Sequence, residues 1–446
     1  MIYNFLRQII KISLFIFFKK IVVTGKENIP VKGPLLIVAN HPNTLMDPLI
    51  IGSITKQKIG FIANAGLFKN KILSKIFRYF HVIPIYRKKD MLPGVKPDNK
   101  NTFVKCHEYL GKGKTLLTFP EGSSLYELKL REIKTGTARI ALSFEDLSNF
   151  EGNLKILPIA LDYSDSIQFR SMISVTVNRP IIVKKYKQAY LNNEVEAILE
   201  LTEDITKELA KNIPNTSGKD QEDFLIKVHK FYSTYHDPKA NLYLDPKRSL
   251  VLRKQISKAL RYMIKHNPGL YKELQIKLVS FFNMLKSEGL TPGFFTDKFL
   301  QKNKSLVFLG YFSKFILLLP IYVFGLLINY LPYILPSKIF QALKIDIEYK
   351  TSVEMITGII TFPFFYCLEI WLFRRYISTE FLHSLLLFLT FLISGYVAMY
   401  YWTEIKRFSR VLHFYFFMNQ GRKLKLMELR NEILKLIDEA RRGLNY

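Results

Sequence analysis

The sequence contains very little cysteine, and its histidines are few and scattered. Among 446 residues there are two cysteines, Cys106 and Cys367. They imply neither a disulfide framework nor a cysteine metal site, and they favour a reducing compartment. The eight histidines do not have the spacing of zinc ligands. We therefore expect a functional site without a metal.

Acidic residues are also few relative to basic ones. The chain has 37 Asp and Glu against 65 Lys and Arg, which gives a formal net charge of +28, together with 36 Phe and 25 Tyr. A basic chain rich in aromatic residues is typical of proteins that bind nucleic acid or an anionic membrane surface. Long apolar segments in the C-terminal third favour the membrane, so we expect no nucleic-acid partner.

Residues 1–24 predict a helix that lies in the lipid headgroup region. Asn4, Arg7, Gln8 and Lys11 fall on one helical stripe, and apolar side chains occupy the rest. Two lysines follow the apolar stretch without the small residues of a cleavage site, so a cleaved signal peptide is not indicated. A helix packed on the protein's own core is the alternative.

Between residues 25 and 190, short apolar runs alternate with helical patterns. This alternation predicts an α/β domain whose mixed, largely parallel sheet is flanked by helices. The predicted strands are 35–39, 59–63, 82–86, 115–119, 154–162 and 173–177, and the predicted helices between them are 67–80, 102–110 and 136–144.

The rest of the chain divides by composition into a charged helical region (191–304), a hydrophobic region (305–403) and a basic amphipathic tail (404–446). The segments 306–330, 355–373 and 381–401 are each long enough to cross a hydrocarbon layer of about 30 Å. If the third segment spans, basic clusters lie on opposite membrane faces, which the positive-inside rule cannot satisfy, so one segment could be re-entrant or interfacial. The other predicted helices are 195–211, 220–235, 250–265, 270–286 and 422–442, and we interpret His229, His236 and His266 as surface or packing residues.

Two short motifs directly follow predicted strands. His41 and Asp47 come after the strand at 35–39, and an imidazole whose tautomer is fixed by a carboxylate can take a proton from a hydroxyl. The second motif follows the strand at 115–119, and its turn can direct N–H groups and hydroxyls at an anion. The alternative is a structural His41 with Asp47 as a helix cap. The second motif consists of Glu121, Gly122, Ser123 and Ser124.

A third candidate, Arg87, follows the strand at 82–86. In parallel sheets, chemistry gathers beyond the carboxyl ends of the strands, so we expect His41, Arg87 and Glu121 to lie at one edge of the sheet. A guanidinium can make two charge-assisted bonds to a phosphate. The alternative is a solvated basic run at 87–89.

In order and spacing, these motifs resemble the glycerophospholipid acyltransferase superfamily, whose members include lysophosphatidate and glycerol-3-phosphate acyltransferases. The resemblance extends over residues 20–185. His41 and Asp47 correspond to the first block of that family, and residues 82–87 to the second, which ends in a phosphate-contacting Arg. Residues 119–122 and 156–159 are similar to the third and fourth blocks.

The chain departs from the family pattern at three points. Five residues, not the usual four, separate His41 from Asp47, so the turn between them must bulge. His81 stands where a Gly commonly opens the second block. Serines follow Gly122 where the family has Thr-Arg, so we expect Lys129, Arg131 or Lys134 to replace the missing Arg. The five-residue gap, the serines of the third block and the run Phe169-Arg170-Ser171 after the fourth block are more similar to a subgroup that includes the fungal glycerol-3-phosphate/dihydroxyacetone-phosphate acyltransferases.

The resemblance implies an enzyme that moves a fatty acyl group from a thioester to the hydroxyl of 1-acyl-sn-glycerol 3-phosphate. It implies His41 as the general base, Asp47 as its partner, and Arg87 with residues 121–124 as the acceptor-binding group. No cofactor is expected, because acyl-coenzyme A or acyl carrier protein is a co-substrate. We expect the cytoplasmic membrane as the location, with the site facing the cytoplasm. Acylation of glycerol 3-phosphate or dihydroxyacetone phosphate, and a non-catalytic lipid-binding scaffold, are the alternatives.

Overall fold

The computed structural model describes residues 2–87, 90, 98–235 and 245–444. The chain forms two compact units. The first consists of Met1–Glu222, Leu244–Lys254 and Asp346–Ser352, and the second of Asp223–Tyr243, Gln255–Ile345 and Val353–Tyr446. The first unit contains the β-sheet and every predicted site residue.

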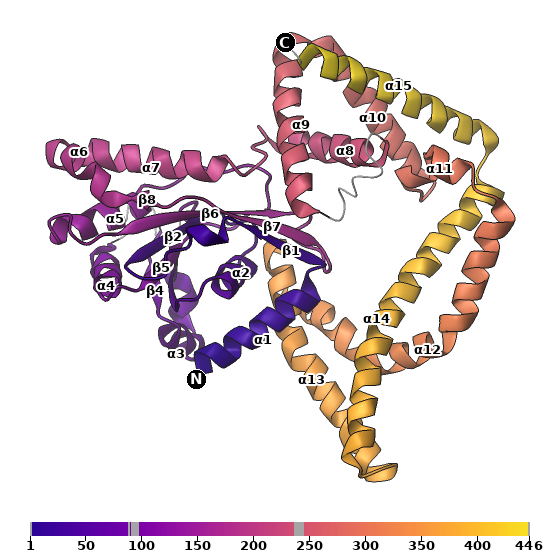
Figure 1. Cartoon of the computed structure of the whole chain (residues 1–446), viewed down its shortest axis with the longest axis horizontal. Coiled ribbons are helices and arrows are strands. Elements are labelled where there is room, and N and C mark those ends of the chain that lie inside the picture. Colours follow the sequence, from indigo (N-terminus) through magenta and orange to yellow (C-terminus); the bar gives the residue numbers. More distant parts are fainter. Residues whose placement is uncertain (1, 88–89, 91–97, 236–244, 445–446) are drawn as a thin grey trace. The chain divides into compact units, whose positions relative to one another are not determined.

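An eight-stranded sheet forms the centre of the first unit (Figure 1). Its order is β1-β7-β6-β2-β5-β3-β4, and β8 pairs with β6. Strands β6 and β7 pair antiparallel, as do β6 and β8, whereas the other neighbours are parallel. The predicted α/β fold with a mixed, largely parallel sheet is therefore confirmed. The strands are β1 (Lys20–Thr24), β2 (Leu35–Ala39), β3 (Ile59–Asn64), β4 (Val82–Ile85), β5 (Thr115–Thr118), β6 (Lys155–Tyr163), β7 (Met172–Val177) and β8 (Ile181–Ile182).

Strand β2 lies between two parallel neighbours, and all five of its residues are buried. A strand covered on both faces needs a continuous apolar run, which is the sequence Leu-Leu-Ile-Val-Ala. Its Leu36 and Val38 join a core cluster with helices α4 (Lys100–Gly111), α5 (Gly136–Leu147) and α7 (Glu194–Ala210). This packing fixes the end of β2, from which the first motif continues.

Helix α1 (Ile2–Phe17) is packed along one side and exposed along the other. Leu14 and Phe17 are buried, and the Phe17 ring meets Phe169 edge-on with 5.2 Å between ring centroids. The opposite side leaves an apolar stripe uncovered. The end of the helix is thus packed on the domain, as the alternative interpretation predicted, and the interfacial location of the exposed stripe stays a prediction. The stripe consists of Phe5, Ile12, Phe15 and Ile16.

Two local predictions were wrong. Residues 20–24 form the strand β1, although they were predicted to be part of the N-terminal helical segment. The predicted helix 67–80 is two pieces, the 3₁₀ helix η2 (Ala65–Lys69) and α3 (Lys71–Tyr79). An edge strand of five residues directly after a helix is too short to show a clear hydrophobic period. Its strand conformation depends on pairing with β7.

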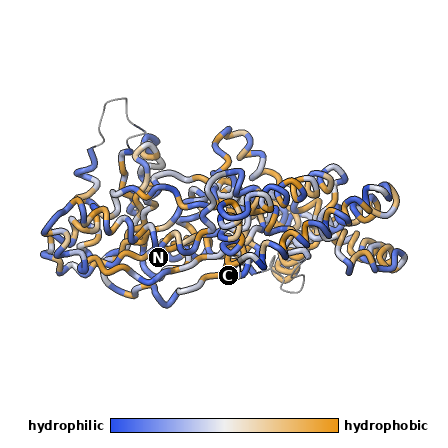
Figure 2. The backbone as a smooth tube through the Cα atoms, turned by 90° about the horizontal axis from the view of Figure 1, so that it is seen from above, coloured by the Kyte–Doolittle hydropathy of each residue, from blue (hydrophilic) through white to orange (hydrophobic). Residues whose placement is uncertain are grey.

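Long helices make up the second unit, and the predicted helices of the charged region are confirmed. Three of its helices are apolar and long enough to cross a membrane by length and composition. Figure 2 shows the backbone coloured by the hydropathy of each residue. After α7, the helices from the charged region onward are α8 (Lys219–Tyr235), α9 (Pro246–His266), α10 (Pro268–Ser287), the short α11 (Asp297–Leu300), the apolar α12 (Lys304–Leu343), α13 (Lys350–Tyr376) and α14 (Phe381–Leu412), and the tail helix α15 (Gln420–Leu444).

Small and polar residues join α12 to α14. A Cβ added to Gly325 would lie 2.3 Å from the carbonyl oxygen of Ser394, so only glycine permits this approach. Asn329 donates from Nδ2 to the carbonyl oxygen of Phe391 at 3.3 Å. In the tail, α15 buries Leu426 and Ile433, so it is a packing helix as well as a charged surface.

Candidate active site

The first motif lies where β2 ends and α2 (Met46–Ile54) begins. His41 follows the strand after one residue, and Asp47 lies in the first turn of the helix. A turn over residues 42–45 absorbs the extra residue, and the N–H of Asp47 donates to the carbonyl oxygen of Asn43 at 3.0 Å. The two side chains meet across this turn, with 2.8 Å between His41 Nδ1 and Asp47 Oδ2.

Asp47 accepts hydrogen bonds on both carboxylate oxygens. Besides His41, the N–H of Asn43 donates to Oδ2 at 2.7 Å, and the hydroxyl of Tyr163 donates to Oδ1 at 2.6 Å. Burial raises the pKa of Asp47, whereas the hydrogen bonds from His41, Tyr163 and Asn43 act in the opposite direction. Burial and the nearby carboxylate raise the pKa of Tyr163 well above its usual value, so its phenol stays a donor.

The bond to Asp47 determines which nitrogen of His41 can act as a base. With Nδ1–H directed at the carboxylate, Nε2 carries the lone pair. The ring stacks on Phe119, with 3.8 Å between centroids and 12° between the planes. Because 16% of its side-chain surface stays exposed, the imidazole is oriented by two partners and still open to a substrate.

Glu121 connects the second motif to the first. Its Oε1 accepts a hydrogen bond from the backbone N–H of His41 at 2.9 Å, and its Oε2 accepts one from Arg131 Nε at 2.8 Å. The carboxylate is buried, so Arg131 supplies its counter-charge. Glu121 therefore holds a neighbouring cation and the backbone at His41 in place.

Arg131 is the basic residue that reaches the turn after Glu121. It donates from Nη1 to the Ser123 hydroxyl at 2.7 Å and from Nη2 to the Ser123 carbonyl oxygen. Of the two other candidates for the missing third-block Arg, Lys129 pairs with Glu127 and Lys134 with Glu132.

Arg87 contacts the same turn, Gly122 and Ser123, as Arg131 does. Its Nη1 donates to the carbonyl oxygen of Gly122 at 2.7 Å, and its Nε and Nη2 hold the carboxylate of Asp90 at 2.5 and 2.9 Å. Gly122 has a φ of +74°, a conformation that favours glycine. The Oγ of Ser124 is buried and has no hydrogen-bond partner within the described part of the chain. The predicted residues therefore converge at one edge of the sheet.

His81 has a backbone conformation that favours glycine, the residue that commonly stands at this position in the family that the motifs resemble. Its φ is +53°, in the left-handed region that is uncommon for residues with a side chain. The backbone conformation is thus kept without the glycine.

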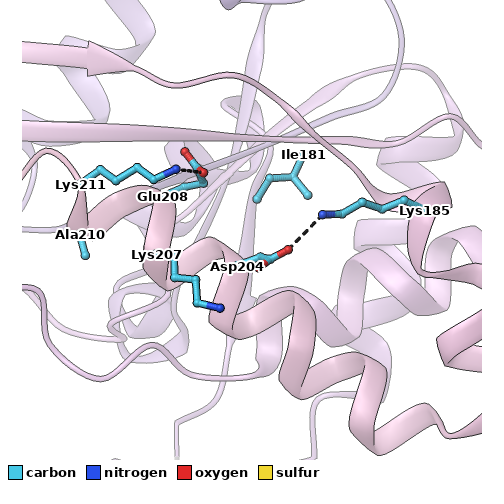
Figure 3. Close-up of a pocket in the computed structure, with 7 residues that line it drawn as sticks. All are labelled: Ile181, Lys185, Asp204, Lys207, Glu208, Ala210 and Lys211. Atoms are coloured by element: carbon cyan, nitrogen blue, oxygen red, sulfur yellow. Dashed lines mark hydrogen bonds and ion pairs between the residues drawn. The ribbon is translucent and has the colours of Figure 1, made fainter.

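A separate depression of about 570 Å³ lies between β8 and α7 (Figure 3). Lys185 and Lys211 pair there with Asp204 and Glu208 at its wall. None of the residues that line it belongs to the two motifs. It is therefore not the candidate active site.

Sequence reasoning missed several neighbours of the His-Asp pair. Tyr163 ends a strand that was predicted to stop one residue earlier, and its strand-end position was an available signal. No role was predicted for Asn43 and Phe119, although both lie inside the motifs. Thr351 contacts Asn43 from more than 300 residues away, and no sequence signal indicates it.

Residues 20–162 match the sequence profile of the acyltransferase family. A 1-acyl-sn-glycerol-3-phosphate acyltransferase of Borreliella burgdorferi is 27% identical over 168 residues, which cover 38% of this chain and 61% of that protein. Glycerol-3-phosphate O-acyltransferase 1 of Saccharomyces cerevisiae is 29% identical over 150 residues, or 33% of this chain and 20% of that protein. The chain thus spans less than two thirds of either relative.

Among solved structures, the 1-acyl-sn-glycerophosphate acyltransferase of Thermotoga maritima aligns with 47% of this chain and 78% of its own. The TM-score is 0.34 and the identity 20%. The expected family resemblance is confirmed by the sequence profile.

Proposed function

Because residues 20–162 form an acyltransferase-family domain, we propose that this chain moves a fatty acyl group from a thioester to the free hydroxyl of 1-acyl-sn-glycerol 3-phosphate, giving phosphatidate. The observation that carries the proposal is the 2.8 Å contact between His41 Nδ1 and Asp47 Oδ2. It leaves Nε2 of a partly exposed imidazole as a base at the end of a buried strand. The relative from Borreliella burgdorferi, whose name specifies this acceptor, supports the choice of substrate.

In the reaction, His41 Nε2 takes the proton of the acceptor hydroxyl as its oxygen attacks the thioester carbonyl carbon. The carbon–sulfur bond then breaks, and the thiolate leaves with the proton from the imidazolium. Asp47 stabilises the imidazolium between these steps. A positioned general base of this kind contributes roughly 10²–10⁴-fold to the rate.

The turn at Gly122 and Ser123 is the proposed binding site for the acceptor's phosphate. Two guanidinium groups bond to the carbonyl oxygens of these consecutive residues, Arg87 to the first and Arg131 to the second. Both are 19–25% exposed, so they can also reach a ligand. The Ser124 hydroxyl, which has no hydrogen-bond partner among the described residues, adds a donor from the next residue of the chain.

The apolar helices support a membrane location for this reaction. Acyl chains and lysophospholipids partition into bilayers, and the three apolar helices are long enough to hold the chain there. The net charge of +28 attracts anionic lipid and anionic acyl donors. Acyl-coenzyme A or acyl carrier protein is the proposed donor, and the cytoplasmic face of the membrane the proposed location.

A second candidate acceptor is glycerol 3-phosphate or dihydroxyacetone phosphate. The five-residue spacing between His41 and Asp47 and the serines after Gly122 favour it, and the yeast relative is named for the first of these acceptors. The same base and the same cations would serve this reaction, because these acceptors also join a hydroxyl to a phosphate.

The test offers the purified chain, in detergent or vesicles, each acceptor with each donor and measures acyl transfer. We expect transfer to 1-acyl-sn-glycerol 3-phosphate, and a loss of about 10²–10⁴-fold in His41→Ala. His266→Ala is the matched control, because this exposed histidine ends α9. Unchanged turnover in His41→Ala would refute the base assignment. Binding of phosphatidate without transfer to any acceptor would favour the non-catalytic scaffold.

A further inference from the structure

A short segment from the C-terminal part of the sequence belongs to the same unit as the His-Asp pair. Residues Asp346–Ser352 include the 3₁₀ helix η7 (Ile347–Tyr349) and the first three residues of α13. Thr351 and Ser352 are 1% and 0% exposed, although they begin an apolar helix. Buried hydroxyls require partners, and these find them in the loop between His41 and Asp47.

Asn43 is the residue of the loop to which these hydroxyls bind. Its Nδ2 donates to Thr351 Oγ1 at 2.8 Å and to the Ser166 carbonyl oxygen at 2.7 Å. Ser352 Oγ donates to Asn43 Oδ1 at 3.4 Å. Both ends of the Asn43 amide are thus held, and Thr351 Oγ1 donates to the same Ser166 carbonyl at 3.1 Å.

A second loop residue repeats this attachment. Thr44 Oγ1 donates to the Glu348 carbonyl oxygen at 3.0 Å and lies 3.5 Å from Ser352 Oγ. Asn43 and Thr44 are two of the five residues that separate His41 from Asp47. The longer spacing therefore coincides with a loop fastened from outside the motif.

Asn43, which Thr351 and Ser352 hold, is itself bonded to Asp47. The backbone N–H of Asn43 donates to Asp47 Oδ2 at 2.7 Å, the same oxygen that lies 2.8 Å from His41 Nδ1. Any displacement of Asn43 moves a donor away from Asp47 and so changes the orientation of the imidazole. A buried amide N–H left without an acceptor costs free energy, and a displacement of Asn43 that gives it a new acceptor reduces that cost.

We propose that Thr351 and Ser352 are positioning residues of the active site, which hold Asn43 and through it the Asp47–His41 pair. The inference rests on the proposed acyltransferase function for its kinetic consequence and on geometry alone for its structural one. The working site then includes residues beyond 20–162, the part that matches the family profile. Residues 346–352 are a required part of it, and they lead into the apolar helix α13.

The experiment compares three variants of the full-length chain in detergent or vesicles. Thr351→Val removes the hydroxyl and keeps the shape, and Thr351→Ser keeps the hydroxyl. Thr357→Val is the matched control, because this hydroxyl of the same helix donates to the carbonyl oxygens of Val353 and Glu354. We expect kcat to fall roughly tenfold in Thr351→Val with KM changed less than about twofold, because one buried donor loses its partner. Thr351→Ser and Thr357→Val are expected to keep the wild-type kcat.

A second measurement reads the loop without relying on turnover. Hydrogen–deuterium exchange over residues 40–47 is expected to be faster in Thr351→Val than in the wild type and Thr357→Val. Thr351 holds the side chain of Asn43, and the backbone N–H of Asn43 is bonded to Asp47. Ser352→Ala is the second variant. It removes the 3.4 Å bond to Asn43 Oδ1, which is longer than the 2.8 Å bond to Thr351, so we expect a smaller effect in the same direction. Wild-type kcat and wild-type exchange in both variants would overturn the proposal. Absence of acyl transfer by the wild type would refute the proposed function, while the exchange data would still decide the positioning role.

Discussion

The hydroxyl of Tyr163 donates to Oδ1 of Asp47 at 2.6 Å, from a side chain that is 2% exposed. The bond joins the last residue of β6 to the first turn of α2. It stabilises the ionised form of a carboxylate whose burial favours the protonated form. Tyr163 is thus a positioning residue for the proposed base, and it can be tested by removing one oxygen atom.

Tyr163→Phe is expected to lower kcat/KM by roughly three- to tenfold, because one hydrogen bond to a buried carboxylate is lost. The bond lowers the pKa of Asp47, so its loss raises that pKa further. The active form has Asp47 ionised, and the acid limb of the kcat/KM profile should therefore move to higher pH. The measurement is kcat/KM against pH. Tyr186→Phe is the matched control. The Tyr186 hydroxyl donates to Asp204 at 2.6 Å, and neither residue belongs to the candidate site. An acid limb at the wild-type pH in Tyr163→Phe would contradict the assignment.

Arg87→Ala is expected to raise the KM for the acceptor by about tenfold, because a charge-assisted bond to a phosphate is lost. The KM for the acyl donor should change less. Arg139→Ala is the control, because Arg139 bonds to Thr135, the N-cap residue of its own helix α5. Initial rates with each substrate varied in turn separate the two KM values. A larger effect on the donor KM would assign Arg87 to the thioester side.

Arg131→Ala is expected to affect both stability and turnover, because it leaves the buried carboxylate of Glu121 without its cation. The free energy of unfolding should fall by about 1–3 kcal/mol. Turnover should fall as well, since Glu121 also accepts the N–H of His41. Thermal unfolding and kcat are measured on the same preparation. Lys134→Ala, which removes an exposed pair with Glu132, should change neither, and the same lack of effect in Arg131→Ala would show that the pair is dispensable.

Acidification is expected to destabilise the second unit through Glu288. Hydrogen bonds from His413 and Arg422 lower the pKa of Glu288 below its ordinary value of 4.5. A carboxyl group whose pKa is lowered by folding adds stability above its unfolded pKa and loses it as the pH falls through the folded pKa. Thermal unfolding recorded from pH 7 to pH 3 should therefore show a smaller acid loss in Glu288→Gln than in the wild type. An equal loss in both proteins would assign the acid sensitivity to other groups.

Much of the fold could be predicted from periodicity. The run at 35–39 became a strand with the predicted bounds, and the helical spacing at 220–235 became α8. The strand β1 was missed, because five residues after a helix carry too little pattern. Nothing in the local pattern indicated that the helix at 67–80 breaks near Asn70.

The candidate site was predictable in its residues and less so in their partners. The order of the motifs named His41 and Asp47, and the parallel sheet explains why Glu121 lies beside them. The replacement for the missing third-block Arg was left open among three basic residues. Its assignment to Arg131 depends on a loop whose path local sequence does not set.

Local sequence pattern was sufficient for six of the eight strands, for the apolar helices and for the residue types that can move a proton, because period and chemistry are local properties of the chain. Only the tertiary structure brings Tyr163 into hydrogen-bond contact with Asp47 and Thr351 into contact with Asn43. A buried polar group needs a partner of the right geometry, and that partner can come from any part of the sequence that the fold brings within about 3 Å.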